Sequence, residues 1–166
     1  MRKRNVMRPV AGTAVRFLLA AFVAWNLAQA ATITITGSWS RVIGAGDLTG
    51  GPGSNLTATY TSATNQVLMG VTGAGNRNWR VDVRRIDTIW HADFVLSIRR
   101  TNNGTAGPGT VTGGTNYLQI TATSQTFVTG RRNRTGITLQ ERLNGVSVSI
   151  PATAYTTTIL FTVVEI

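Results

Sequence analysis

The chain has 166 residues, 42% of them hydrophobic, and it contains no cysteine, which excludes disulfides and thiol chemistry. It carries 16 basic residues, 6 acidic residues and a single histidine, for a net charge of +10. So few carboxylates and imidazoles leave little material for acid–base catalysis or for a metal site.

The first 30 residues have the layout of a secretory signal peptide. An apolar run from Phe17 to Trp25 is followed by the small-residue exit Ala28-Gln29-Ala30 and preceded by Arg2, Lys3, Arg4 and Arg8. We predict cleavage after Ala30. The alternative is a membrane anchor, but the apolar core is about a dozen residues long, whereas a spanning helix needs roughly twenty.

Cleavage changes the charge of the protein that remains. Five of the 16 basic residues lie in the first 30 positions and all 6 acids follow them, so residues 31–166 carry a net charge of +5. We therefore expect no nucleic-acid partner and no membrane span after cleavage. We expect the protein to be secreted or held at the cell surface, by way of the periplasm if the envelope has two membranes.

Residues 31–166 are predicted to form one domain of short strands. Their composition, rich in Thr, Val, Ile and Gly, favours strands over helices. Alternating apolar residues mark strands at 32–36, 79–86, 93–100, 136–143, 145–150 and 158–166, and a more buried one at 66–71. Glycine-rich loops separate them at 44–55, 72–78, 101–116 and 129–136.

This pattern predicts an all-β fold: an antiparallel two-sheet β-sandwich of seven to nine strands with immunoglobulin-like connectivity. Within it, Trp79 is in phase with Val81 and Val83, so we expect its side chain in the core. A closed barrel is the main alternative fold.

We predict that the protein is not an enzyme and binds no metal or cofactor. His91 lies between Asp87 and Asp93, but no serine lies in a Gly-x-Ser-x-Gly elbow, so a small hydrolase using His91 remains only a third alternative. The acids are too widely spaced for a calcium loop. The glycine-rich loops lack the Lys-Ser/Thr of a phosphate-binding loop.

Two groups of side chains are candidates for contact with a polysaccharide. Trp90 breaks the strand pattern beside His91 and Asp93, so its ring is the best candidate for an exposed sugar platform. If the pairs containing Arg84 and Arg99 lie on adjacent strands, they would form an arginine ladder able to grip carboxylates or sulfates. The alternative is that the arginines only keep a solvent-exposed face of the sheet hydrated, which opposes edge-to-edge association.

Both ends of the predicted domain are strands without polar tails. Ile33 and Ile35 alternate at its start, and Ile159, Phe161 and Val163 alternate near its end. Such ends suit a subunit whose sheet edges are completed by another chain through strand addition. The alternative is that both are ordinary first and last strands, paired inside their own domain.

The C-terminal segment "GVSVSIPATAYTTTILFTVVE" resembles the last hairpin of chaperone-usher type pilins and spore coat protein U-like domains. The segment "ATITITGSW", which follows the predicted cleavage site, resembles their N-terminal segment. The resemblance implies an incomplete immunoglobulin-like sandwich. It further implies a groove that a periplasmic chaperone fills first and the N-terminal extension of the next subunit fills later.

The sequence therefore predicts an exported, non-enzymatic structural or adhesive surface protein, such as a fimbrial or coat subunit that assembles by strand addition. Its partners would be copies of itself or another envelope protein. The alternative is a secreted carbohydrate-binding module.

Overall fold

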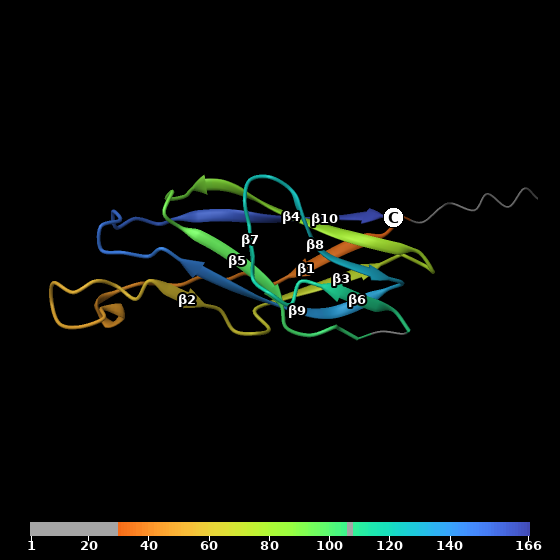
Figure 1. The fold of residues 1–166 in the computed structure, drawn as a ribbon, viewed down its shortest axis with the longest axis horizontal. Coiled ribbons are helices and arrows are strands. Elements are labelled where there is room, and N and C mark those ends of the chain that lie inside the picture. The colour runs from red at the N-terminus through yellow and green to blue at the C-terminus, as the bar shows by residue number, and fades with distance from the viewer. Residues whose placement is uncertain (1–29, 106–107) are drawn as a thin grey trace, which may run out of the picture.

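The computed structural model describes residues 30–105 and 108–166, which form ten β-strands and one turn of 3-10 helix, η1 (Ala45–Asp47). The strands lie in two antiparallel sheets (Figure 1). This confirms the predicted all-β, two-sheet sandwich. Within the described ranges, no helix is long and apolar enough to cross a membrane. Residues 1–29 of the predicted signal peptide lie outside the described residues.

The first sheet has the strand order β1-β3-β9-β5-β7. Its strands are β1 (Thr32–Thr36), β3 (Val67–Thr72), β9 (Arg134–Asn144), β5 (Val95–Arg100) and β7 (Leu118–Gln119). The short β2 (Thr59–Thr61) pairs with the end of β9, beyond the stretch of β9 that pairs with β3. The strand β9 is therefore the centre of this sheet, and β1 is one of its edges.

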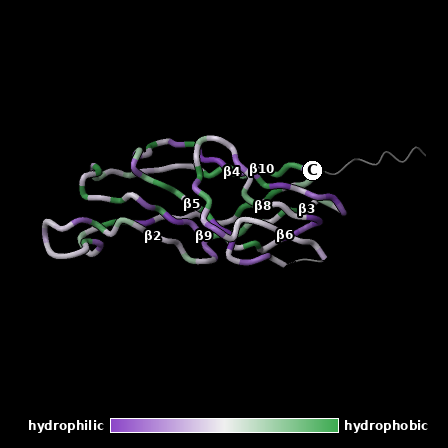
Figure 2. The backbone as a smooth tube through the Cα atoms, in the orientation of Figure 1, coloured by the Kyte–Doolittle hydropathy of each residue, from purple (hydrophilic) through white to green (hydrophobic). Residues whose placement is uncertain are grey.

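The second sheet has the strand order β10-β4-β8-β6. Its strands are β10 (Thr156–Glu165), β4 (Asn78–Ile89), β8 (Gln125–Arg131) and β6 (Thr110–Gly113). The longest pairing joins β10 to β4 and runs from Thr156 opposite Ile89 to Glu165 opposite Trp79. The last strand of the chain is thus an edge strand, and its apolar character continues to the C-terminal end (Figure 2).

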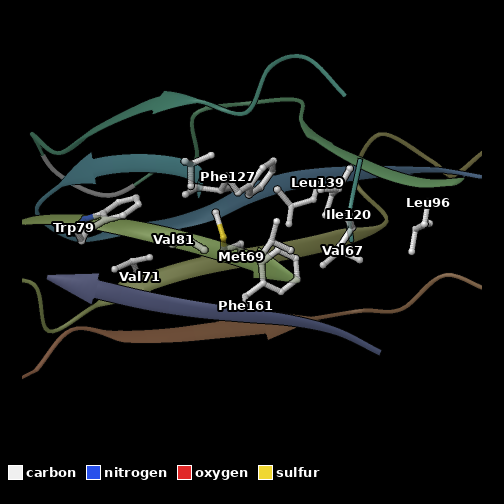
Figure 3. Packing of buried hydrophobic residues seen from close by; sticks show 14 of the residues in the cluster. Val67, Met69, Val71, Trp79, Val81, Leu96, Ile120, Phe127, Leu139 and Phe161 are labelled. Atoms are coloured by element: carbon white, nitrogen blue, oxygen red, sulfur yellow. The ribbon is translucent and has the colours of Figure 1, made fainter. Parts of the chain in front are cut away.

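Alternating side chains from both sheets fill the space between them. In β4, Trp79, Val81 and Val83 are fully buried, which confirms the predicted core position of Trp79. The side chains of Met69, Val81 and Phe161, from three different strands, all point into this core (Figure 3). Burial of such side chains is the main favourable contribution to folding, at about 25 cal/mol per Å² of apolar surface.

The predicted strand at residues 145–150 is wrong. Gly145 has a φ of +86°, which ends the extended backbone after β9. A Cβ at this position would stand only 1.9 Å from the carbonyl oxygen of Asp93, so the chain needs glycine here. Beyond it Val146 is buried, but Val148 is 57% exposed, so the alternation in the sequence reflects no sheet.

Strands β2, β6, β7 and β8 were not predicted, and with the six predicted strands that the structure contains they bring the total to ten, above the expected seven to nine. The segment that contains β6 is glycine-rich and was assigned to a loop. In β8, neighbouring Phe127 and Val128 are both buried, because the register against β4 shifts between Val81 and Asp82. Such a bulge breaks the alternation that marks a strand in a sequence.

Candidate functional site

The predicted assembly residues lie on the two terminal strands, and each strand pairs within its own domain. In β1, Ile33 lies opposite Val71 and Ile35 opposite Met69. In β10, Ile159, Phe161 and Val163 lie opposite Arg85, Val83 and Val81. Each strand has a partner along one edge only, since β1 ends the first sheet and β10 ends the second in the part of the chain that the structure describes.

A groove of about 570 Å³ opens between these two edges, and we call it the terminal groove. One wall is built by Ile35 and the residues that follow β1, and the other by Tyr155 and the first half of β10. Between these walls lie Val67, Trp90, Leu96, Glu141 and Leu143. The groove therefore reaches into the interior between the two sheets.

The groove exists because the chain leaves the sheet after β1. Gly37 has a φ of +103°, and a Cβ there would stand 2.4 Å from the carbonyl oxygen of Gln66. Residues 37–43 then belong to no strand. Trp39 of this segment packs against the core, whereas Val42 is 86% exposed. Along this stretch, no strand that the structure describes in the first sheet faces the start of β10.

Glu141 is a buried carboxylate in the lining of the terminal groove. It lies in β9 between Leu139 and Leu143, in the alternating register that faces the interior, and it is only 6% exposed. Its Oε2 atom has no hydrogen-bond partner among residues 30–105 and 108–166, and burial raises its pKa to about 7. Its backbone groups are satisfied by Ser62, which both donates to the carbonyl and accepts from the N–H.

Sequence reasoning missed Glu141, although the signal was present. Ile137, Leu139 and Leu143 were recognised as one apolar face of a strand, and position 141 belongs to that same face. An acid in phase with core residues is a sign of a buried, functional or strained group.

Trp90, His91 and Asp93 lie together, but as part of a packed turn. Trp90 contacts Phe94 edge to face at 5.4 Å, and its indole N–H donates to the carbonyl of Phe94. The backbone N–H of Asp93 donates to Nδ1 of His91. Trp90 is half-buried against both apolar clusters and borders the terminal groove, so it is not the free-standing platform that the sequence suggested.

The structure does not bring Arg84 and Arg99 together. Arg84 lies in β4 of the second sheet and Arg99 in β5 of the first, so the predicted ladder does not form. The chain between them crosses from one sheet to the other, which a pattern of alternation does not reveal.

Arg99 belongs instead to a different cluster, with Tyr117, Gln140 and Arg142, which we call the Arg–Tyr cluster. The guanidinium carbons of Arg99 and Arg142 lie 4.8 and 3.8 Å from the centre of the Tyr117 ring. Gln140 accepts from both Arg99 and the hydroxyl of Tyr117. Among the described residues no carboxylate forms an ion pair with either arginine.

Comparison of the chain with protein-family models, with curated proteins and with solved structures found no match. Within residues 30–105 and 108–166, no three His, Asp or Glu side chains gather in a way that would hold a metal ion. The terminal groove and the Arg–Tyr cluster are therefore the two sites on which a functional argument can rest.

Proposed function

We propose that this protein is an exported, non-enzymatic structural subunit of a cell-surface or extracellular assembly, and that it assembles by strand addition at the terminal groove. The observation that carries the proposal is the position of β1 and β10. They are edges of two different sheets, they flank one groove, and each has an edge free of partners within the described residues. A row of free backbone N–H and C=O groups is a template for another strand.

Exposed apolar side chains support the same site. Ile35 is 38% exposed on one wall of the groove, and Leu160 is 36% exposed on the outer face of β10. Burying both against an added strand would contribute to association, because apolar surface removed from water is favourable.

Light scattering and negative-stain microscopy on the purified protein would test this proposal. We expect the native protein, alone or mixed with its envelope proteins, to form assemblies that Leu160→Lys loses, because a lysine on an edge strand opposes edge-to-edge pairing. The matched control is Thr112→Lys on β6, the opposite edge of the same sheet, which should leave assembly intact. A native chain that stays strictly monomeric, alone and with its envelope proteins, would overturn the proposal.

A second candidate function, binding of an acidic polysaccharide, is favoured by the Arg–Tyr cluster. Two guanidinium groups lie against one ring, and neither forms an ion pair with a carboxylate among the described residues, so a carboxylate or sulfate ligand would supply a complementary charge. Retention of the protein on immobilised heparin or alginate, and its loss in the double variant R99Q/R142Q, would support this function. Unchanged retention in that variant would exclude the cluster as the binding site.

A further inference from the structure

The terminal groove contains one chemical group that an apolar strand cannot satisfy. Glu141 is 6% exposed and faces the interior, and its Oε2 atom is buried without a hydrogen-bond donor. A carboxylate taken out of water without a donor is costly, and the cost is already incurred when the domain folds. Any occupant that brings a hydrogen-bond donor to this oxygen would offset part of this free-energy cost.

The described residues do not supply that donor. No ion pair in the described residues includes Glu141. Arg41 is the one cation among the described residues that line the groove, but Asp47 holds its guanidinium, which also lies 5.1 Å from the centre of the Tyr60 ring. The terminal strands β1 and β10 contain no Lys or Arg.

The shape of the site indicates an extended peptide as the occupant. The start of β10 has a free edge along the groove, and the facing segment 37–43 forms no strand. The backbone N–H and C=O groups of this edge can therefore form hydrogen bonds with an added strand over several residues. The walls are mainly apolar, with Trp39 and Trp90 among them. Alternating apolar side chains would fill them, and Glu141 interrupts this pattern at one point.

We propose that the occupant of the terminal groove is an extended segment of a different protein, with apolar side chains at alternate positions and one Lys or Arg that pairs with Glu141. This inference rests on the proposed function and adds the identity of the strand to it. A segment of a second copy taken from β1 or β10 would leave the carboxylate unpaired, since neither strand has a cation. The charge of Glu141 thereby selects among partners.

Synthetic peptides test the inference directly. The parent peptide alternates Thr and Ile, and in each member of the set one Ile is replaced by Lys, so that every register is sampled. The reference peptides carry acetyl-lysine at the same position, which keeps the length and removes the charge. Binding is followed by the fluorescence of the native protein, because Trp39 and Trp90 line the groove.

We expect one lysine peptide to bind the native protein about tenfold or more tightly than its acetylated reference, as charge-assisted hydrogen bonds do. The preference should disappear in Glu141→Gln and persist in Asp93→Asn, which removes one exposed negative charge outside the groove. The comparison of lysine with acetyl-lysine on the native protein stands alone if Glu141→Gln does not fold.

The outcomes separate the two proposals. Peptides that bind with no preference for lysine would overturn the pairing with Glu141 and leave strand addition standing. A preference for lysine that survives in folded Glu141→Gln would also overturn it. No binding by any peptide would overturn the inference, and together with a protein that stays monomeric both alone and with its envelope proteins it would overturn the proposed function as well.

Discussion

The backbone N–H of Ala31 donates to Oε1 of Glu165 over 2.7 Å, which ties the start of β1 to the end of β10. The other oxygen of the same carboxylate accepts from Arg77. The two terminal strands are therefore joined where the chain enters β1. The terminal groove opens farther along, where residues 37–43 take the place of a strand.

This contact changes character if export removes residues 1–30. The amide nitrogen of Ala31 then becomes an α-ammonium group, and its hydrogen bond to Glu165 becomes an ion pair. We expect Glu165→Gln to lower the free energy of unfolding by roughly 0.5 to 1 kcal/mol more in the cleaved protein than in the uncleaved one.

Mass spectrometry of the exported protein establishes whether it begins at Ala31, and urea unfolding at low and high salt measures the difference. The excess effect should shrink at high salt, because an exposed pair is screened. An equal effect of Glu165→Gln in both forms would contradict the ion pair.

The buried carboxylate of Glu141 predicts an unusual dependence of stability on pH. Burial raises its pKa from the usual 4.5 to about 7, so between these values the native state holds a proton that the unfolded chain releases. The free energy of unfolding therefore falls as pH rises from 4.5 to 7, by about 3 kcal/mol from this group, and stays low above 7.

Urea unfolding across this pH range measures the slope, and Glu141→Gln should flatten it and stabilise the protein above pH 7. Asp93→Asn is the control for the removal of one acidic residue, because its side chain is 67% exposed and lies outside the groove. Parallel pH profiles for the native protein and Glu141→Gln would show that the slope has another source.

The strands that were predicted are those in which apolar side chains recur at every second position over several residues. This holds along much of β1, β4, β5, β9 and β10, with Glu141 as an interruption in β9, and these strands carry most of the core. Alternation arises because one face of each strand packs against the other sheet. It says which residues share a face, but not which strand lies beside which.

The features that the sequence did not predict depend on how strands and loops distant in the sequence lie beside one another. Arg84 and Arg99 lie on consecutive strands but in different sheets, because the turn at 90–94 crosses the sandwich. The groove depends on Gly37 and the end of β9 on Gly145, and the backbone of each glycine closely approaches a residue far away in the sequence, Gln66 and Asp93 respectively. The sequence shows Glu141 in phase with core residues, but only the structure shows that it lines a groove.

Gly130 of β8 provides a test of how tightly the core is packed. A Cβ there would stand 2.3 Å from Cζ2 of Trp79 and 2.6 Å from the carbonyl oxygen of Thr110. The indole cannot move aside easily, since it is fully buried and its N–H donates to the carbonyl of Arg132 at 2.6 Å.

We expect Gly130→Ala to lower the free energy of unfolding by about 1 to 3 kcal/mol, the usual cost of overpacking a core. Thermal unfolding measures it. Gly46→Ala is the matched control: a Cβ at Gly46 meets nothing within 4 Å, so the melting temperature should stay the same. A Gly130→Ala variant as stable as the native protein would mean that this end of the core is loosely packed.

The ring of Tyr117 is expected to position both guanidinium groups of the Arg–Tyr cluster for an anion. Arg142 lies against the ring at 3.8 Å and Arg99 at 4.8 Å, while Gln140 holds the hydroxyl. Tyr117→Leu keeps both positive charges but removes the surface that orients them. It therefore separates an ordered site from mere attraction between opposite charges.

If the cluster binds acidic polysaccharides, Tyr117→Leu should weaken binding to heparin or alginate by about tenfold, which corresponds to ~1.4 kcal/mol. Tyr155→Leu is the matched control, because this tyrosine packs against Phe94 and His91 beside the terminal groove. Binding is measured by calorimetry at several salt concentrations. If Tyr117→Leu binds as the native protein does, with the same salt dependence, attachment is by net charge alone and the second candidate function loses its support.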